Sequence, residues 1–213
     1  MQRRRFIQGI GALGIGALAL GFLSAGSRDT WKLDPHDLAP KTGFGFGSLK
    51  FTMTDAETGK TVTAADFKGK IVMLYFGYTY CPDVCPTTLA NIALVLKKLG
   101  DKAKDVRFLF VTVDPRRDTL PVLKQYAAAF APQVIGLRGT ETELKAAAAQ
   151  FGARYSVHPS PDPAKYAVSH TRLIYVFNRQ GVPEFMTGNL SIPDPDLKGL
   201  ERDLAHLVST NGV

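Results

Sequence analysis

The stretch "IVMLYFGYTYCPDVCPTTLANIALVLKKLG", residues 71–100, joins three patterns that decide the fold. The apolar run 71–76 is suited to a central strand that is buried on both faces. Residues 86–99 carry apolar side chains at helical spacing, and Gly100 is a typical stop signal after a helix. Between the strand and the helix lie Cys81 and Cys85, the only cysteines of the chain. We therefore expect a core strand, a cysteine loop and a helix in direct succession.

The rest of the chain alternates between strand-like and helix-like segments. Strands are expected at 49–54, 61–63, 106–113, 134–137, 171–178 and 182–186, and helices at 119–130, 141–151 and 196–208. Residues 152–169, "GARYSVHPSPDPAKYAVS", are expected to form a long loop, which calls for a functional reason. The order predicts an α/β fold with a mixed sheet and helices on both faces. With a cysteine motif where the first core strand meets its helix, we expect a thioredoxin-like (peroxiredoxin-like) architecture.

The N-terminus has the composition of an export signal. Residues 1–26 contain three arginines, a long apolar run and no acidic residue. The segment "RRRFIQ" at 3–8 resembles a twin-arginine signal, although Gln2 and Gln8 depart from that pattern. Both a cleaved signal peptide and an uncleaved membrane anchor fit its length. We expect residues 27–43 to be a flexible tether and 44–213 to be a folded domain that is exported, either periplasmic or anchored to the outer face of the cytoplasmic membrane.

Charge and cysteine content argue against nucleic-acid binding and against a purely structural disulfide. Without residues 1–26 the chain has 23 basic and 19 acidic residues, a net charge of +4, and no basic cluster with interleaved aromatic residues. Nucleic-acid binding is therefore not expected. A disulfide between Cys81 and Cys85 would close a loop of about five residues and stabilise the fold by only about 2 kcal/mol, so a purely structural bridge is the weaker interpretation.

The cysteine loop favours reactive sulfur. Pro86 is preferred at the first position of a helix, which predicts Cys85 as the N-cap and Cys81 in the preceding loop. At a helix N-terminus we expect both thiol pKa values to fall from about 8.5 toward about 3.5–7.5. Thiolates serve both as nucleophiles and as soft metal ligands, so this expectation does not separate a redox pair from a metal site. Three residues separate the cysteines, and this wider loop lets both sulfurs turn toward a common third ligand.

Histidines are the natural third ligand for such a pair. Two thiolates and an imidazole suit Cu(I), and also zinc. We expect His36, in the tether, and His206, on the last helix, to be solvated, and His158 to lie in the long loop. His170 stands directly before the apolar strand 171–178, where an α/β sheet builds its site. The spacing alone leaves His170 open between a ligand and a structural histidine.

Three stretches together resemble the Sco/SenC family, copper-binding thioredoxin-like proteins that assemble the dinuclear copper site of cytochrome c oxidase. They are "GYTYCPDVCPTTL" (77–89), "VTVDPRRDTLPVLKQYAAAF" (111–130) and "YAVSHTRLIYVFNRQG" (166–181), and the resemblance runs from about 44 to 208. It implies a copper site made by Cys81, Cys85 and His170, with cytochrome c oxidase subunit II as the copper acceptor. An exported thiol reductant or a copper donor would be a further partner.

The resemblance also points to two aspartates. Asp114 and Asp118 match family positions and are candidates for outer-shell or partner contacts. Their alternative roles are a loop turn for Asp114 and a helix cap for Asp118, and for Asp118 the cap is preferred. Ser169 and Thr171 stand where many relatives have Asp and Ser around the histidine, so the surroundings of His170 are expected to differ.

Three functions remain to be weighed from the sequence. The preferred one is a metallochaperone, which binds copper and turns over no substrate, and whose copper loading depends on the redox state of Cys81 and Cys85. The alternative is a thiol-disulfide oxidoreductase that reduces the cysteines of the same oxidase site or of other exported proteins. A thiol peroxidase is the least favoured, because the cysteine loop lacks the expected leading proline.

Overall fold

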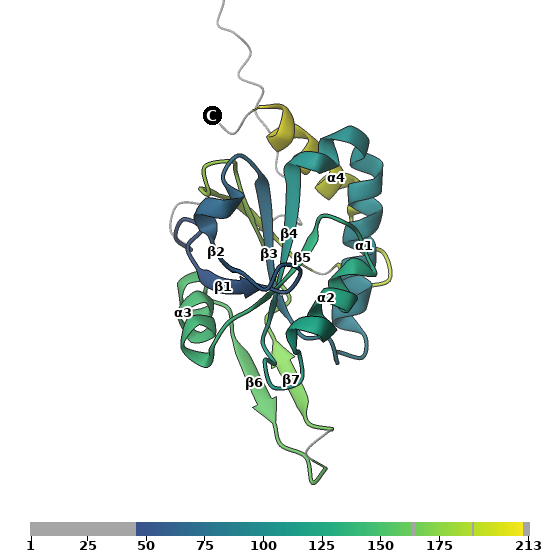
Figure 1. Ribbon diagram of the computed structural model, residues 1–213. Coiled ribbons are helices and arrows are strands. Elements are labelled where there is room, and N and C mark those ends of the chain that lie inside the picture. The colour runs from purple at the N-terminus through teal and green to yellow at the C-terminus, as the bar shows by residue number, and fades with distance from the viewer. Residues whose placement is uncertain (1–45, 163–164, 189, 211–213) are drawn as a thin grey trace, which may run out of the picture. The chain divides into compact units, whose positions relative to one another are not determined.

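The computed structural model describes residues 46–162, 165–188 and 190–210 (Figure 1). The expectations for residues 1–26 and 27–43, including His36, fall outside these ranges. Within the described residues, no helix combines the length and apolarity needed to cross a bilayer.

The core is a seven-stranded mixed sheet in the order β2-β1-β5-β4-β3-β8-β9. Neighbours β3, β4 and β5 run parallel, and the other pairs are antiparallel. The strands are β1 (Thr52–Asp55), β2 (Thr61–Thr63), β3 (Ile71–Gly77), β4 (Val106–Thr112), β5 (Val134–Arg138), β8 (Ile174–Phe177) and β9 (Pro183–Thr187). Every residue of β3 is buried, as its continuous apolar run predicts.

Helices cover both faces of this sheet. They are α1 (Val84–Leu99), α2 (Leu120–Ala128), α3 (Glu141–Phe151) and α4 (Leu197–Ser209), with short 3-10 turns η1 (Ala64–Phe67) and η2 (Gly100–Asp105). The crossovers β3–α1–β4 and β4–α2–β5 step in one direction across the sheet, and right-handed crossovers then place both helices on the same face. Figure 1 shows α4 beside α1 on that face and α3 on the opposite one.

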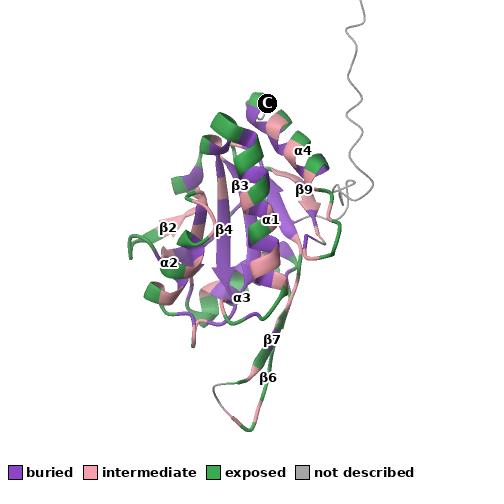
Figure 2. Ribbon diagram, turned by 90° about the vertical axis from the view of Figure 1, so that its right-hand side faces the viewer, coloured by how far each residue is buried: buried purple, intermediate pink, exposed green. Residues whose placement is uncertain are grey.

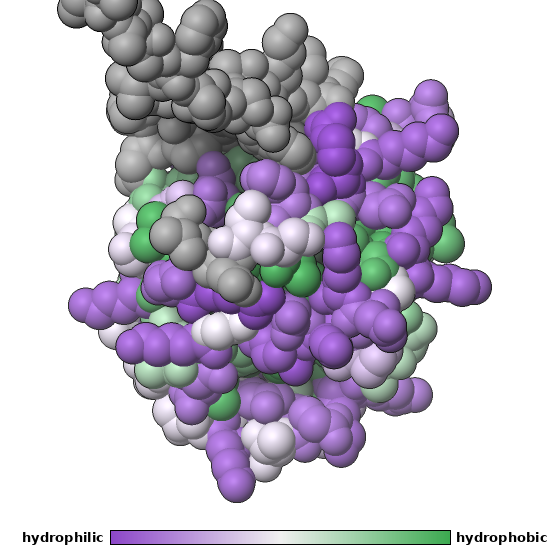
Figure 3. Space-filling view, turned by 90° about the horizontal axis from the view of Figure 1, so that it is seen from above, coloured by the Kyte–Doolittle hydropathy of each residue, from purple (hydrophilic) through white to green (hydrophobic). Residues whose placement is uncertain are grey.

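Side chains of β3 alternate between the two faces. Tyr75 points toward α1, where its hydroxyl lies 3.9 Å from the Cys85 sulfur. Phe76 points the other way and packs near Phe151 of α3. Burial of a large apolar side chain contributes roughly 1.5–3 kcal/mol, so this two-sided core holds α1 and the cysteine loop against the sheet. Figure 2 shows the buried central strands behind α1, and the face in Figure 3 is mostly hydrophilic with scattered apolar residues.

The expected loop at 152–169 is wrong, because this segment contains a separate two-stranded ribbon. β6 (Tyr155–His158) pairs antiparallel with β7 (Ala167–His170), and Tyr155 lies opposite His170. The ribbon extends beyond the end of the main sheet (Figures 1 and 2). Its strands are short and mostly exposed, so the prolines between them dominate the sequence signal. His170 consequently ends β7 and does not directly precede a core strand.

Two expected helix caps are also wrong. α1 begins at Val84 with Asp83 as its N-cap, so Cys85 lies inside the first turn. Pro86 fits there because the first N–H groups of a helix have no intrahelical partner in any case. α2 has Thr119 as its N-cap, and the buried carboxylate of Asp118 instead binds hydroxyl groups of the neighbouring loop and strand.

Candidate metal centre

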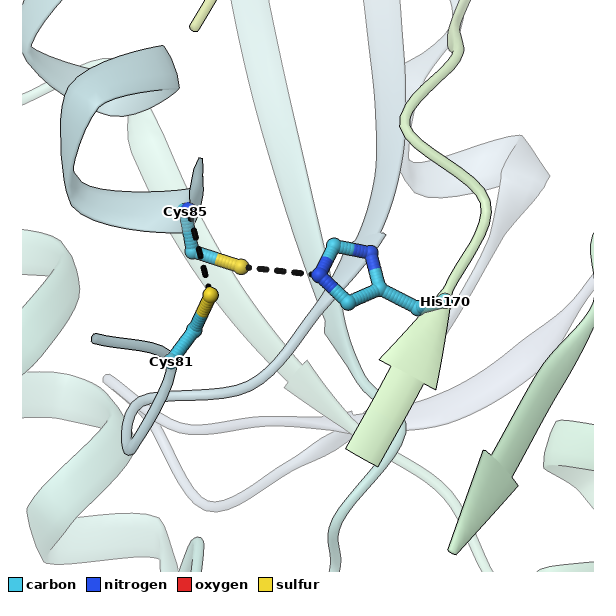
Figure 4. A group of neighbouring side chains, drawn as sticks. All are labelled: Cys81, Cys85 and His170. Carbon is cyan, nitrogen blue, oxygen red and sulfur yellow. Dashed lines mark hydrogen bonds between the residues drawn. The ribbon is translucent and has the colours of Figure 1, made fainter. Parts of the chain in front are cut away.

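Three elements bring two sulfurs and an imidazole together. Cys81 lies in the loop after β3, Cys85 in the first turn of α1, and His170 at the end of β7 (Figure 4). Their potential ligand atoms all lie within 4.8 Å of one another. The Cys85 sulfur is 3.3 Å from His170 Nε2, and the Cys85 backbone N–H donates to the Cys81 sulfur at 3.4 Å. The arrangement can therefore present three soft or borderline donors to one metal ion.

The orientation of His170 leaves its Nε2 free to act as a ligand. Nδ1 lies 3.0 Å from the carbonyl oxygen of Thr171. A carbonyl only accepts hydrogen bonds, so this contact places the proton on Nδ1 and the lone pair on Nε2. The rings of Tyr75 and Tyr78 meet the imidazole edge-on at 5.8 and 5.7 Å, which restricts its rotation.

The two thiols differ in acidity, so the expectation that both pKa values fall is wrong for one of them. The hydrogen bond from the Cys85 thiol lowers the pKa of Cys81, and the hydrogen bond from the Cys85 backbone N–H lowers it further. The same thiol hydrogen bond and deep burial raise the pKa of Cys85. Cys81 is 9% exposed, whereas Cys85 is fully buried. The pair therefore consists of a slightly exposed thiolate and a completely buried thiol.

Asp118 holds the cysteine loop through hydrogen bonds with Thr79. Its carboxylate is fully buried and accepts hydrogen bonds from the Thr79 backbone N–H at 3.0 Å and the Thr79 hydroxyl at 2.6 Å. The Thr112 hydroxyl donates to it at 2.5 Å. Burial nevertheless raises the pKa of Asp118, because desolvation outweighs these donors. Thr79 stands two residues before Cys81, so Asp118 fixes the approach of the loop to the site.

Replacing Asp118 tests this support. Asp118→Ala leaves up to three buried donors without their acceptor, so the free energy of unfolding should fall by at least about 1–3 kcal/mol. Asp118→Asn keeps one acceptor oxygen and should lose less. Urea denaturation of the reduced protein measures both, with the exposed Asp101→Ala as a control that stays within about 0.5 kcal/mol of wild type. Equal stability of Asp118→Ala and wild type would contradict this role.

The remaining candidates lie outside the ligand cluster. Asp114 is buried and pairs with Arg117, while His158 is exposed and contacts the Ser169 hydroxyl at 3.0 Å. Among the described residues, the cluster of potential ligands contains neither aspartate, nor His158, nor His206. The sequence interpretation did not single out Tyr75, Tyr78 or Gly77, although all three stand within the stretch 71–100. A glycine between aromatic residues at a strand end is the signal that could have found Gly77.

Open space adjoins the site on the ribbon side. A cleft of about 830 Å³ lies between α3 and the base of the ribbon, and its lining includes Lys145, Arg154, Ser169 and His170. His170 therefore borders an open cleft, whereas neither cysteine lines it.

Comparison with known proteins places the chain in a family. The family model described as SCO1/SenC matches residues 45–198. Protein SenC of Rhodobacter capsulatus is 34% identical over 176 residues, which cover 74% of this chain and 79% of that protein. The mitochondrial SCO2 homolog of Bos taurus is 34% identical over 138 residues, 64% of this chain and 52% of the bovine protein. This chain thus spans about half the length of the bovine relative.

Solved structures of similar proteins include several with copper bound. ScoI of Bradyrhizobium japonicum with copper bound is 36% identical, has a TM-score of 0.65, and is matched over 75% of this chain and 98% of that one. Yeast Sco1 with copper bound is 30% identical, with a TM-score of 0.67, over 76% of this chain and 88% of that one. These similarities confirm the expected thioredoxin-like fold with its mixed sheet. With its family model covering most of the sequence, the chain belongs to the SCO1/SenC family.

Proposed function

We propose that this chain is a copper metallochaperone that binds copper through Cys81, Cys85 and His170. The observation that carries this proposal is the convergence of three donor atoms within 4.8 Å from three separate elements. Similar proteins have been solved with copper bound, which supports copper as the metal. The chaperone delivers its copper to the dinuclear copper site of cytochrome c oxidase subunit II.

The donor set suits Cu(I) as a transferable cargo. Thiolates are the soft ligands that select Cu(I), and a neutral imidazole adds a third donor without charge. Two thiolates and one Cu(I) carry a net charge of −1. Structural zinc sites are usually closed by four protein ligands, whereas the cluster among the described residues offers three. A three-ligand site leaves room for an incoming thiolate.

Ligand accessibility suggests how the metal leaves. His170 is partly exposed and borders the open cleft, while Cys85 is completely buried. An acceptor thiolate therefore reaches the metal from the side of His170 and Cys81. Cys85 is the ligand that releases last, so copper remains bound until the acceptor has made its own bonds.

The N-terminal segment and the two thiols indicate where the protein works and which redox partner it needs. We propose that residues 1–26 direct export, so that the domain works in the periplasm or on the outer face of the cytoplasmic membrane. There the Cys81–Cys85 pair can oxidise, which removes the soft site. An exported thiol reductant must then restore both thiols before copper is loaded again.

A thiol-disulfide oxidoreductase is the alternative, favoured by the unequal acidity of the two cysteines. The Cys81 thiolate would attack a partner disulfide and form a mixed disulfide, releasing one partner thiolate. Cys85, after losing its proton, would attack the Cys81 sulfur and release the second partner thiolate. The partner gains two electrons, and the Cys81–Cys85 disulfide remains.

An anaerobic Cu(I) titration against a competing chelator tests the proposal. The reduced protein should bind one equivalent tightly, and Cys81→Ser and Cys85→Ser should each lose this binding, because a hydroxyl is a poor ligand for Cu(I). Mixing the loaded protein with a reduced soluble fragment of subunit II should transfer the copper.

Two experimental outcomes would count against a copper metallochaperone. Unchanged binding in both serine variants would contradict the copper site itself. Reduction of an oxidised subunit II fragment by the metal-free protein, without any copper transfer to the reduced fragment, would favour the oxidoreductase.

A further inference from the structure

One turn of the chain contacts both halves of the site. It follows β4 and runs from Asp114 to Asp118, closed by hydrogen bonds from the backbone N–H groups of Arg117 and Asp118 to the Asp114 carbonyl at 3.2 and 2.9 Å. Through Asp118 it binds Thr79 and so holds the cysteine loop. Through Arg117 it reaches Tyr166, the residue that directly precedes β7.

Each of Arg117, Asp114 and Tyr166 contacts the other two, and we call this group the Arg117 clamp. Arg117 Nε donates to Asp114 Oδ2 at 2.5 Å, and Arg117 Nη1 donates to the Tyr166 carbonyl at 3.0 Å. The guanidinium lies 3.7 Å from the centroid of the Tyr166 ring, and the Tyr166 hydroxyl donates to Asp114 Oδ1 at 2.5 Å. The Arg117 and Asp114 side chains are 14% and 2% exposed, so water screens their pairing weakly.

The ribbon needs such an attachment. β6 and β7 form a two-stranded sheet of their own and have no strand partner in the seven-stranded sheet. An isolated two-stranded hairpin is at best marginally stable in water. β7 nevertheless ends in His170, whose Nε2 must remain beside the Cys85 sulfur. The pairing of β7 with β6 alone therefore does not fix this side chain relative to the cysteines.

The same guanidinium also contacts the cysteine side of the site. It lies 4.8 Å from the centroid of the Tyr80 ring, and Tyr80 directly precedes Cys81. It lies 5.9 Å from the Tyr78 ring, which in turn packs edge-on against His170. A cation stacked between aromatic rings favours one arrangement of all of them.

We propose that Arg117 is a positioning residue, which through Asp114 and Tyr166 fixes β7 so that His170 faces Cys81 and Cys85. This inference rests on the proposed copper-binding function of those three residues. The Arg117 clamp adds no ligand of its own. It acts on the metal only by setting the position of the imidazole relative to the two sulfurs.

The pKa values of Tyr166 and Arg117 in the clamp lie above the usual values of these side chains. Desolvation and the neighbouring Asp114 carboxylate raise the pKa of Tyr166 to about 12. The phenol therefore stays a hydrogen-bond donor, and the guanidinium stays charged. Both side chains therefore keep, near neutral pH, the protons that they donate within the clamp.

A double-mutant cycle with His170 tests the proposal. Residues that orient a ligand usually contribute about 10–100-fold to metal affinity, so Arg117→Gln should weaken Cu(I) binding by that factor. In a His170→Ala background the same substitution should change the affinity less than about 2-fold, because its effect passes through the imidazole. Tyr166→Phe keeps the ring and removes one hydrogen bond, and should show a smaller loss with the same dependence on His170.

A matched ion pair elsewhere controls for lost stability. Arg179 is 17% exposed and pairs with Asp105 at 3.1 Å, so Arg179→Gln removes a comparable buried contact away from the ribbon. It should lower the unfolding midpoint and leave the copper affinity unchanged. An equal loss of affinity from Arg117→Gln with and without His170, or wild-type affinity in both Arg117→Gln and Tyr166→Phe, would overturn the positioning role.

A readout without copper separates this inference from the proposed function. The ring-proton NMR signals of His170 report its place beside the Tyr75 and Tyr78 rings. They should shift in metal-free Tyr166→Phe and Arg117→Gln and remain in place in Arg179→Gln. If the wild type binds no copper, the proposed function fails, and these signals alone test the positioning role of the clamp. Unchanged His170 signals in both variants would refute that role.

Discussion

His170→Ala is expected to lower the Cu(I) affinity of the reduced protein by about 100-fold or more. Residues that merely orient a ligand already contribute about 10–100-fold, and His170 would be a ligand itself. The variant keeps both thiolates, so residual binding with two sulfur donors should remain. Competition with a Cu(I) chelator under anaerobic conditions measures the change.

The control for this variant lies on the same ribbon. His158 pairs with Ala167 at the far end of the two strands, and its ring nitrogen contacts the Ser169 hydroxyl at 3.0 Å. His158→Ala removes an imidazole from the same element and should leave the copper affinity unchanged. Equal affinity of His170→Ala and wild type would show that the imidazole is no ligand, and would leave the cysteine pair as a redox couple.

Stability should change little in His170→Ala. The side chain is partly exposed, and it contacts two tyrosine rings edge-on, the Cys85 sulfur and the Thr171 carbonyl. Aromatic pairs of this kind contribute about 0.5–1.5 kcal/mol each. A large loss of affinity beside a modest fall of the melting temperature would therefore identify a metal ligand and not a structural histidine.

The sequence predicts the part of the site that neighbouring residues determine. The run 71–76, the cysteine spacing and the helical pattern that ends at Gly100 suffice to place Cys81 and Cys85 at a strand-to-helix junction. The apolar strands are similarly local, and the expected helix 141–151 matches α3 in the structure. These features follow from periodicity and backbone preference, which a single stretch of chain carries.

The missed features depend on contacts between distant segments. The ribbon is held by the Arg117 clamp. Arg117 precedes α2, β5 and α3 in the chain, and Tyr166 follows them. Asp118 looks like a helix cap locally, yet its carboxylate is drawn inward by two threonines from β4 and the cysteine loop. The opposite pKa shifts of the two cysteines likewise arise from the sulfur–sulfur hydrogen bond and, for Cys85, from deep burial, neither of which the spacing shows.

Gly77→Ala is expected to destabilise the fold and distort the metal centre at once. An added Cβ at this last residue of β3 would lie 2.7 Å from Phe110 Cε2 and 2.9 Å from the Cys85 sulfur. Phe110 is fully buried and packs between Tyr75 and Tyr126, so it has little room to retreat. Overpacking a tight core usually costs about 1–3 kcal/mol.

The expected loss of stability sets the size of the thermal shift. In a domain of this length each kcal/mol lowers the melting temperature by about 2–4 °C, so Gly77→Ala should melt several degrees earlier. Gly47→Ala is the benign control, because the nearest atom to its added Cβ is 3.7 Å away. An unchanged melting temperature in Gly77→Ala would show that the strand end relaxes freely around the new methyl group.

Copper affinity distinguishes a crowded site from a merely weakened fold. Gly136→Ala places its Cβ 2.6 Å from Leu123 Cγ on α2, and so overpacks the same face of the sheet without touching a potential ligand. Both alanine variants should lose stability, but only Gly77→Ala should lose copper affinity, because its methyl group displaces the Cys85 sulfur. Equal affinities in the two variants would mean that the site tolerates movement of Cys85. The glycine would then be required by Phe110 alone, and the close approach of the strand end to the sulfur would have no part in metal binding.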